Sequence, residues 1–217
     1  MSKGSLEAPG ILGLHEVMKT RILIVAGSNR PKANSRVLCE IAADAARAAG
    51  AEVKLLDLHE TELPFFQSGH SERYASPVVA EVRELATWAQ GFILATPEYH
   101  GSLGTAIKNW FDWLYVELAG KTAGVIASTG GGGGDMSITA VKNNMNWCHG
   151  FTLPFHAAAK YADFKDGDLA NDRIRERVQR VAHDLVRYAP IIHEAFESAK
   201  EHGSELASGF SGFHLKD

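Results

Sequence analysis

The stretch ILIVAGSNR occupies residues 22–30. Its first five residues are apolar, several are β-branched, and no polar residue alternates with them, which predicts a parallel strand buried on both faces. A polar turn with glycine and proline follows at residues 27–33, and a helical pattern covers residues 35–49. Gly50 then provides a C-cap signal. The stretch therefore predicts a central strand that enters a helix through a polar turn.

The same alternation of apolar runs and helical patterns continues along the chain. Further strands are predicted at residues 53–58, 92–95, 122–127 and 153–158. Further helices are predicted from residue 77 to Gly91, at 105–118, at 136–148 and at 171–200, the last one bent or ended at Pro190. Five strands that alternate with five helices predict an α/β fold, a parallel sheet with helices on both faces.

The 217 residues suffice for one substantial domain. We divide the chain into an N-terminal arm at residues 1–20, a domain at 21–200 and a C-terminal tail at 201–217. The first residues lack the pattern of a signal peptide, and no apolar stretch reaches the ~20 residues of a membrane span. The chain is therefore expected in the cytoplasm, without a membrane partner.

Composition and motifs exclude several classes of function. The net charge is −4 and no run of Lys and Arg occurs, which argues against a nucleic-acid partner. Neither a dinucleotide-binding glycine motif nor a P-loop is present. HExxH, G-x-S-x-G and CxxC are also absent, and we assign no metal site. Cys39 and Cys148 are expected to be buried free thiols.

Three loops follow strands at one predicted edge, where ligands bind in open α/β sheets. In the first, at residues 27–35, free backbone N–H groups, short polar side chains and Arg30 suit a phosphate. A helix cap made by Asn34 or Ser35, with Arg30 in solvent, is the alternative. This residue pattern by itself leaves both open.

The second and third loops suit a planar ligand. Residues 96–104 contain proline and glycine, which let the backbone approach a flat ring, and Tyr99 could stack on it. Acid–base chemistry by Glu98 and His100 is less favoured than a cap made by Glu98 on the following helix and an exposed His100 imidazole. Five consecutive glycines at residues 130–134 favour close approach of a ligand over a floppy loop.

In order and spacing these loops resemble the NADPH-dependent FMN reductase family, which includes quinone, azo-dye and chromate reductases. The resemblance covers about residues 21–187. Its most specific block runs from Pro97-Glu98-Tyr99-His100-Gly101-Ser102 into Lys108-Asn109 and Asp112-Trp113-Leu114. It implies a flavodoxin-like three-layer sandwich with a five-stranded sheet in the order 2-1-3-4-5. Two departures are Ala33, where Ser is frequent, and His100, where Asn is common; the latter leaves substrate preference open.

The resemblance also implies the cofactor site. The FMN phosphate would be held by Ser28, Arg30, Asn34 and Ser35. The isoalloxazine would be lined by Pro97, Glu98, Tyr99, His100, Gly101, Ser128, Thr129, Gly130, Gly131 and Gly132. The helix with Lys108, Asn109 and Asp112 would take part in a homodimer or homotetramer.

The function expected from the sequence is an FMN-dependent NAD(P)H oxidoreductase. Hydride would pass from NADPH or NADH through FMN to a quinone, flavin, azo compound or metal ion, in ping-pong order. No catalytic side chain is assigned, because placement of the ring matters more than a titrating group. The alternatives are a flavodoxin-type electron carrier and a flavin-free module that acts through protein contacts.

Overall fold

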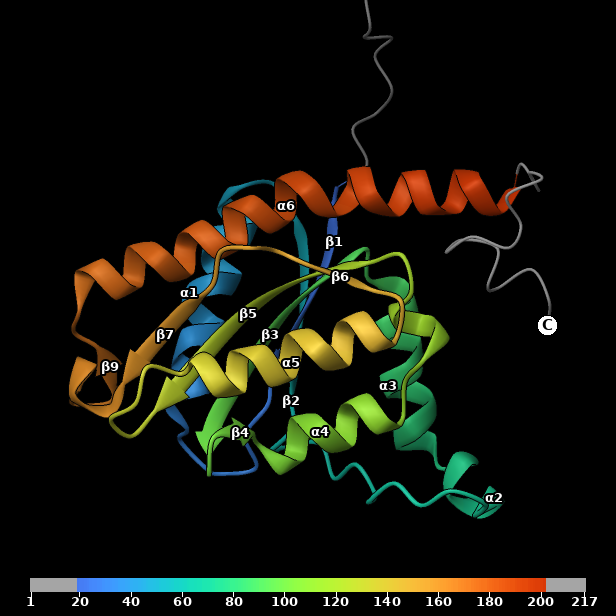
Figure 1. Cartoon of the computed structure of the whole chain (residues 1–217), viewed down its shortest axis with the longest axis horizontal. Helices are drawn as coiled ribbons and strands as arrows, with labels where there is room; N and C mark the ends of the chain where they lie inside the picture. The colour runs from blue at the N-terminus through green and yellow to red at the C-terminus, as the bar shows by residue number, and fades with distance from the viewer. Residues whose placement is uncertain (1–18, 202–217) are drawn as a thin grey trace, which may run out of the picture.

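The computed structural model describes residues 19–201, which form a seven-stranded sheet with helices around it (Figure 1). The strands are β1 (Arg21–Ala26), β2 (Glu52–Asp57), β3 (Gly91–Tyr99), β4 (Ser102–Leu103), β5 (Thr122–Thr129), β6 (Phe151–Thr152) and β7 (Ala157–Lys160). All pairs except β3 with β4 are parallel. With β6 and β7 taken as one interrupted strand, the five main strands lie in the order 2-1-3-4-5. The flavodoxin-like order is confirmed.

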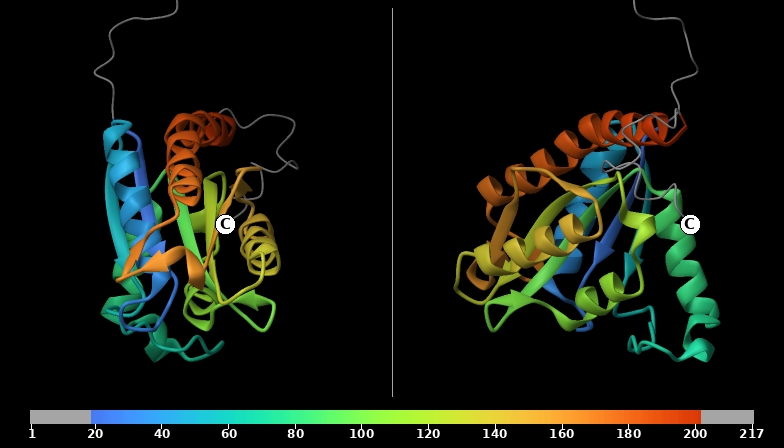
Figure 2. Two further views of the ribbon diagram at one scale, coloured as in Figure 1. Left: turned by 90° about the vertical axis from the view of Figure 1, so that its left-hand side faces the viewer. Right: turned by 45° about the vertical axis from the view of Figure 1, so that its right-hand side comes forward.

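Helices cover both faces of the sheet (Figure 2). They are α1 (Asn34–Ala48), α2 (Ser71–Tyr74), α3 (Pro77–Trp88), α4 (Thr105–Asp112), α5 (Asp135–Trp147) and α6 (Asp172–Glu201). Strand β1 shows why both faces are covered. Successive side chains of a strand point to opposite faces of the sheet. Ile22 and Ile24 pack with α1 and α6, whereas Leu23 and Val25 pack with α3, α4 and α5. A sheet apolar on both sides must be covered on both sides.

The fifth strand was predicted as one piece at residues 153–158, and this is wrong. β6 ends at Thr152 and β7 begins at Ala157, although both pair with β5. Pro154 lies between them and has no N–H to donate to the sheet. After β7, the chain forms a short helix η2 (Tyr161–Asp163) and a hairpin of β8 (Phe164–Lys165) and β9 (Asp168–Leu169) that the sequence analysis missed.

The segment predicted as a loop at residues 96–104 is also different. β3 continues to Tyr99, turns, and returns as β4, with Glu98 opposite Leu103. Beyond Ala95, β3 no longer pairs with β1, and its residues Thr96 and Pro97 pair with β5 alone. Proline is tolerated there because the strand is locally an edge.

The helix predicted at residues 105–118 is too long. α4 ends at Asp112, and a separate turn η1 (Val116–Leu118) follows. The N–H of Leu114 donates to the carbonyl of Phe111, which is the tighter spacing that closes a helix. The backbone then departs from helical angles at Tyr115, whose N–H is held by the buried carboxylate of Glu117.

α6 neither ends nor is interrupted at Pro190. Proline has no N–H, so the carbonyl four residues earlier, that of Val186, loses its helical partner. The hydroxyl of Thr20 donates to this carbonyl at 3.4 Å. The segment before β1 therefore replaces the missing bond from outside the helix.

The proposed domain division stays a prediction. Residues 1–18 of the proposed arm and 202–217 of the tail lie outside the described residues. Within 19–201, no helix is both long enough and apolar enough to cross a bilayer.

Candidate flavin site

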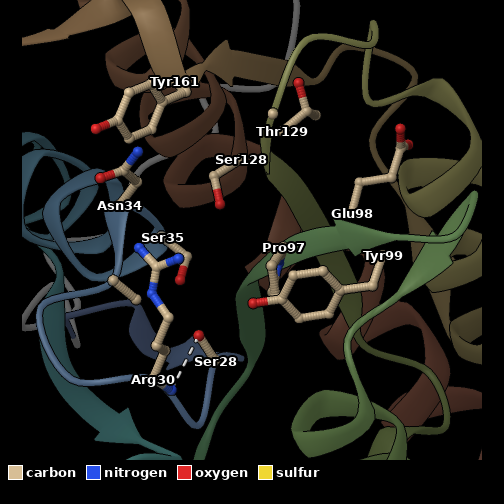
Figure 3. A pocket seen from close by; sticks show the side chains of 12 residues that line it. Ser28, Arg30, Asn34, Ser35, Pro97, Glu98, Tyr99, Ser128, Thr129 and Tyr161 are labelled. Atoms are coloured by element: carbon tan, nitrogen blue, oxygen red, sulfur yellow. Dashed lines mark hydrogen bonds between the residues drawn. The ribbon is translucent and has the colours of Figure 1, made fainter.

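The three unusual loops meet at the carboxyl edge of the sheet, at the lower left of Figure 1, and enclose a cavity of about 480 Å³. This volume lies in the range of ~300–1,000 Å³ that is usual for small-molecule sites. The lining residues that the sequence analysis named are Ser28, Arg30, Asn34, Ser35, Pro97, Glu98, Tyr99, Ser128, Thr129 and Gly130. Figure 3 shows that the labelled residues of this set come from three different segments around one space, although Glu98 directs its carboxylate away from that space. The structure therefore brings together ten of the fourteen expected side chains and glycines.

One end of the cavity is formed by the start of α1. Its N-cap residue, Ala33, offers no side-chain acceptor, so the first N–H groups of the helix have no side-chain cap. Ser35 is 1% exposed, and its Oγ has no hydrogen-bond partner within residues 19–201. Arg30 is exposed beside it, while Ser28 Oγ accepts the N–H of Arg30 at 3.2 Å. The proposed capping of the helix by Asn34 or Ser35 is not what this geometry shows.

These features fit a phosphate group. A buried hydroxyl without a partner is costly, and so are uncapped N–H groups at a helix start. A phosphate placed here would accept from both, and the helix dipole and the guanidinium of Arg30 would favour its negative charge. The donor set of this chain therefore matches the phosphate end of FMN.

The β3–β4 hairpin forms the second wall. Thr96 is fully buried; its Oγ1 accepts the N–H of Gly104 at 3.0 Å and donates to the carbonyl of Pro97 at 2.9 Å. These two hydrogen bonds of Thr96 hold the β3–β4 hairpin in position beside the cavity. At the tip, His100 and Gly101 have φ of +51° and +70°. Two successive positive φ angles are typical of a two-residue hairpin turn.

The hairpin gives His100 a backbone role. Left-handed φ is tolerated by Asn and, less often, by His. His at this position is therefore compatible with the turn. His100 and Gly101 are not among the residues that line the cavity. The departure at position 100 is thus a change at a turn rather than at the cavity wall.

The absence of a side chain has a different explanation at different positions of the glycine run 130–134. Gly134 has φ +81°, and a Cβ on it would lie 3.0 Å from Ala158 Cβ and 3.1 Å from Ala127 Cβ. A Cβ on Gly132 would lie 3.1 Å from the Glu98 carboxylate. Gly130 and Gly131 do not have positive φ. A Cβ on either of them would have no atom of the described residues within 4 Å. Their lack of side chains has no cause within the described chain and fits close approach of a ligand.

Two lining residues were missed. Ala33 lies in the phosphate loop, and Tyr161 follows β7 and stands across the cavity from Pro97 and Tyr99 (Figure 3). Tyr161 is 70% exposed. Its position directly after the fifth predicted strand was the available signal, because all parallel strands end at the same edge. Of the expected residues, Gly131 and Gly132 are not among those lining the cavity.

Residues 108–113 do not line the cavity. Asn109 accepts the N–H of Phe66 at 2.8 Å and donates to the carbonyls of Leu63 and Pro64 at 3.3 and 3.1 Å. Trp113 Nε1 also donates to Pro64, at 2.8 Å. Lys108 and Asp112 form an exposed ion pair. The block therefore fastens the loop after β2 to α4.

Comparison with known proteins agrees with this geometry. The model of the family "NADPH-dependent FMN reductase" matches residues 20–163, which include all three loops. The chain belongs to this family. Its members are oxidoreductases that use FMN and NADPH, and the expectations for enzyme class and cofactors are confirmed at this level.

Named relatives extend over most of the chain. The NADPH-dependent FMN reductase ArsH of Shigella flexneri is 27% identical over 212 residues, which is 93% of this chain and 81% of that protein. An NADPH azoreductase of a Bacillus species is 26% identical over 183 residues, 83% of this chain and 97% of that protein.

Among solved structures, FerB, an NAD(P)H:(acceptor) oxidoreductase of Paracoccus denitrificans, superposes with a TM-score of 0.65 at 21% identity. The match covers 80% of this chain and 98% of FerB. At this identity the likeness supports the flavodoxin-like fold of this FMN reductase family member.

Proposed function

We propose that the chain binds FMN in the cavity at the carboxyl edge of the sheet and reduces a small acceptor with NADPH or NADH. The observation that carries the proposal is the buried Ser35 hydroxyl without a partner, beside uncapped helix N–H groups and Arg30. Bound FMN would take hydride from the nicotinamide and pass reducing equivalents to the acceptor in ping-pong order.

The residues of the chain would hold and shield the cofactor. Ser28, Arg30, Asn34 and Ser35 would bind the phosphate. Backbone groups of the hairpin and of Gly130 could approach the ring, and Tyr99, 45% exposed, would stand at its edge. Backbone N–H groups that face the edge of the flavin ring would stabilise the negative charge that develops on the ring when it is reduced.

The acceptor is proposed as a small molecule of several classes: a quinone, a flavin, an azo compound or a metal ion. An azoreductase among the relatives supports the azo class. Within residues 19–201, no three His, Cys, Asp or Glu side chains gather as they would to hold a metal ion. The homodimer or homotetramer and the cytoplasmic location stay predictions.

One experiment tests the proposal. The purified protein is titrated with FMN, its visible spectrum is recorded, and NADPH is added without oxygen. We expect the visible absorption bands of the bound flavin to bleach when NADPH reduces it. Bound flavin that stays oxidised with both NADPH and NADH would favour the electron-carrier alternative. A protein that binds no FMN would contradict the proposal and favour the flavin-free alternative.

A further inference from the structure

Glu98 lines the cavity, and its carboxylate accepts a hydrogen bond from outside the cavity lining. Its side chain runs away from Arg30, toward the segment that follows β5 (Figure 3). Oε2 accepts the N–H of Ser137 at 3.1 Å. Ser137 lies in the first turn of α5, whose N-cap residue Gly134 has no side chain to cap the helix. Glu98 therefore supplies, from β3, the acceptor that the sequence of α5 lacks.

Two further contacts fix the glycine segment 130–134 between β5 and α5. Ser137 Oγ, which is fully buried, donates to the carbonyl of Gly134 at 2.9 Å. Thr129 Oγ1 donates to the carbonyl of Gly132 at 2.8 Å. Glu98 Oε1 lies 3.1 Å from where a Cβ of Gly132 would be. The segment is thus held at Gly132 and at Gly134. The carboxylate of Glu98 links β3 to α5, the helix that begins directly after the segment.

Such a link matters because glycine loses more backbone entropy on ordering than any other residue. A segment of five glycines would have to be ordered when a ligand binds, unless the protein orders it beforehand. We propose that Glu98 is a positioning residue that pre-orders segment 130–134 for FMN by capping α5. This inference rests on the proposed function, since FMN is the ligand for which the segment is ordered.

The test compares Glu98→Ala with Glu98→Gln, whose amide oxygen still accepts a hydrogen bond. FMN affinity is measured by flavin fluorescence, and hydrogen–deuterium exchange of residues 130–138 is measured without FMN. Loss of a cap predicts about tenfold weaker FMN binding and faster exchange in Glu98→Ala. Glu98→Gln is expected to stay within about threefold of the wild type for the same reason. Glu81→Ala, an exposed carboxylate on α3, is the matched control.

The two readouts separate the possible failures. If wild-type protein binds no FMN, the proposed function fails, while exchange in the FMN-free variants still tests the link. If the wild type binds FMN and Glu98→Ala matches it in affinity and exchange, Glu98 has no positioning role. Equal loss in both variants would also overturn the proposal, because charge would then matter instead of the cap. Glu98→Met, which keeps the length without an acceptor, replaces Glu98→Ala if that variant does not fold.

Discussion

Ser35 and Arg30 differ sharply in environment although both face the same cavity. Ser35 is buried, with an Oγ that no described residue satisfies, and Arg30 is exposed. A buried donor can bind a ligand without first breaking a protein contact, whereas the exposed guanidinium must be ordered when it binds. The two residues would therefore contribute differently to the proposed phosphate site: Ser35 by prior placement and Arg30 by charge.

Arg30→Ala is expected to weaken FMN binding by roughly 1.5–3 kcal/mol, the free energy of a hydrogen bond to a charged group. Flavin fluorescence titration measures the effect. Arg47→Ala, at the far end of α1 and paired with Asp44, is the control and should leave the affinity unchanged. Equal affinities of the wild type and Arg30→Ala would remove Arg30 from the site.

The glycines at 130 and 134 are expected to respond in opposite ways. Gly134→Ala must adopt φ +81° against Ala158 and Ala127, so the free energy of unfolding should fall by about 1–3 kcal/mol. Gly130→Ala meets no described atom and should leave stability within ~0.5 kcal/mol of the wild type while weakening FMN binding. Thermal unfolding and fluorescence titration of both variants check this. Unchanged FMN affinity in Gly130→Ala would mean that the ligand does not approach there.

At the scale of elements, α4 acts as a support for the loop after β2. The side chain of Asn109 is largely buried and makes three hydrogen bonds to the backbone of residues 63–66. Phe66, Tyr74 and Trp113 then pack edge-to-face around this loop, with ring centroids 5.1–6.1 Å apart. The most specific part of the family block thus has a structural role in this protein.

Asn109→Ala is expected to lower the free energy of unfolding by about 1–3 kcal/mol, because the partly buried backbone groups of residues 63–66 lose their partner. Urea denaturation measures it. Lys108→Ala breaks only the exposed ion pair with Asp112 and should cost less than about 0.5 kcal/mol. A loss in Asn109→Ala as small as that in Lys108→Ala would show that the hydrogen bonds of Asn109 do not support the loop.

At the scale of the molecule, the candidate flavin site and the buried residue Lys121 lie at opposite ends of the sheet. The cavity is at the carboxyl ends of the strands, whereas Lys121 precedes β5 at its amino end and is 5% exposed. Its Nζ donates to the carbonyls of Ala86 and Thr87 at 2.7 and 3.0 Å. Burial lowers the pKa of Lys121 from 10.5 to about 8, against the attraction of Glu117 and Glu197.

This shift predicts a pH dependence of stability. Between pH 8 and 10.5 the unfolded chain keeps the Lys121 proton that the folded protein has released. Because the unfolded state then binds more protons, the contribution of Lys121 to stability rises with pH across this window, by up to ~1.4 kcal/mol per pH unit. Below pH 8 its contribution is constant.

Urea denaturation of the wild type and Lys121→Met at several pH values isolates this contribution. The wild type should gain stability relative to the variant from pH 8 upward. Parallel pH profiles would contradict the lowered pKa. FMN affinity should be equal in both proteins, because Lys121 lies at the other end of the sheet.

Local patterns of sequence predicted most elements because each depends on neighbouring residues. The apolar run at residues 22–26 matches β1 almost to the residue, and helical periodicity located α1 and α5. Pro154 and Pro190 were harder to interpret. The first interrupts a strand, whereas the second stays inside a helix, where Thr20, distant in sequence, donates to the freed carbonyl.

The sequence by itself determined the flavodoxin-like order of layers and the three loops at one edge, because strand burial and helix periodicity are local properties. Only the tertiary structure decided how those loops meet. It showed that Tyr161 lines the cavity, that His100 lies in a turn, and that Glu98 caps α5. Each of these facts depends on contacts between segments far apart in the chain. Such contacts are set by the packing of the whole sheet, which no local pattern of residues contains.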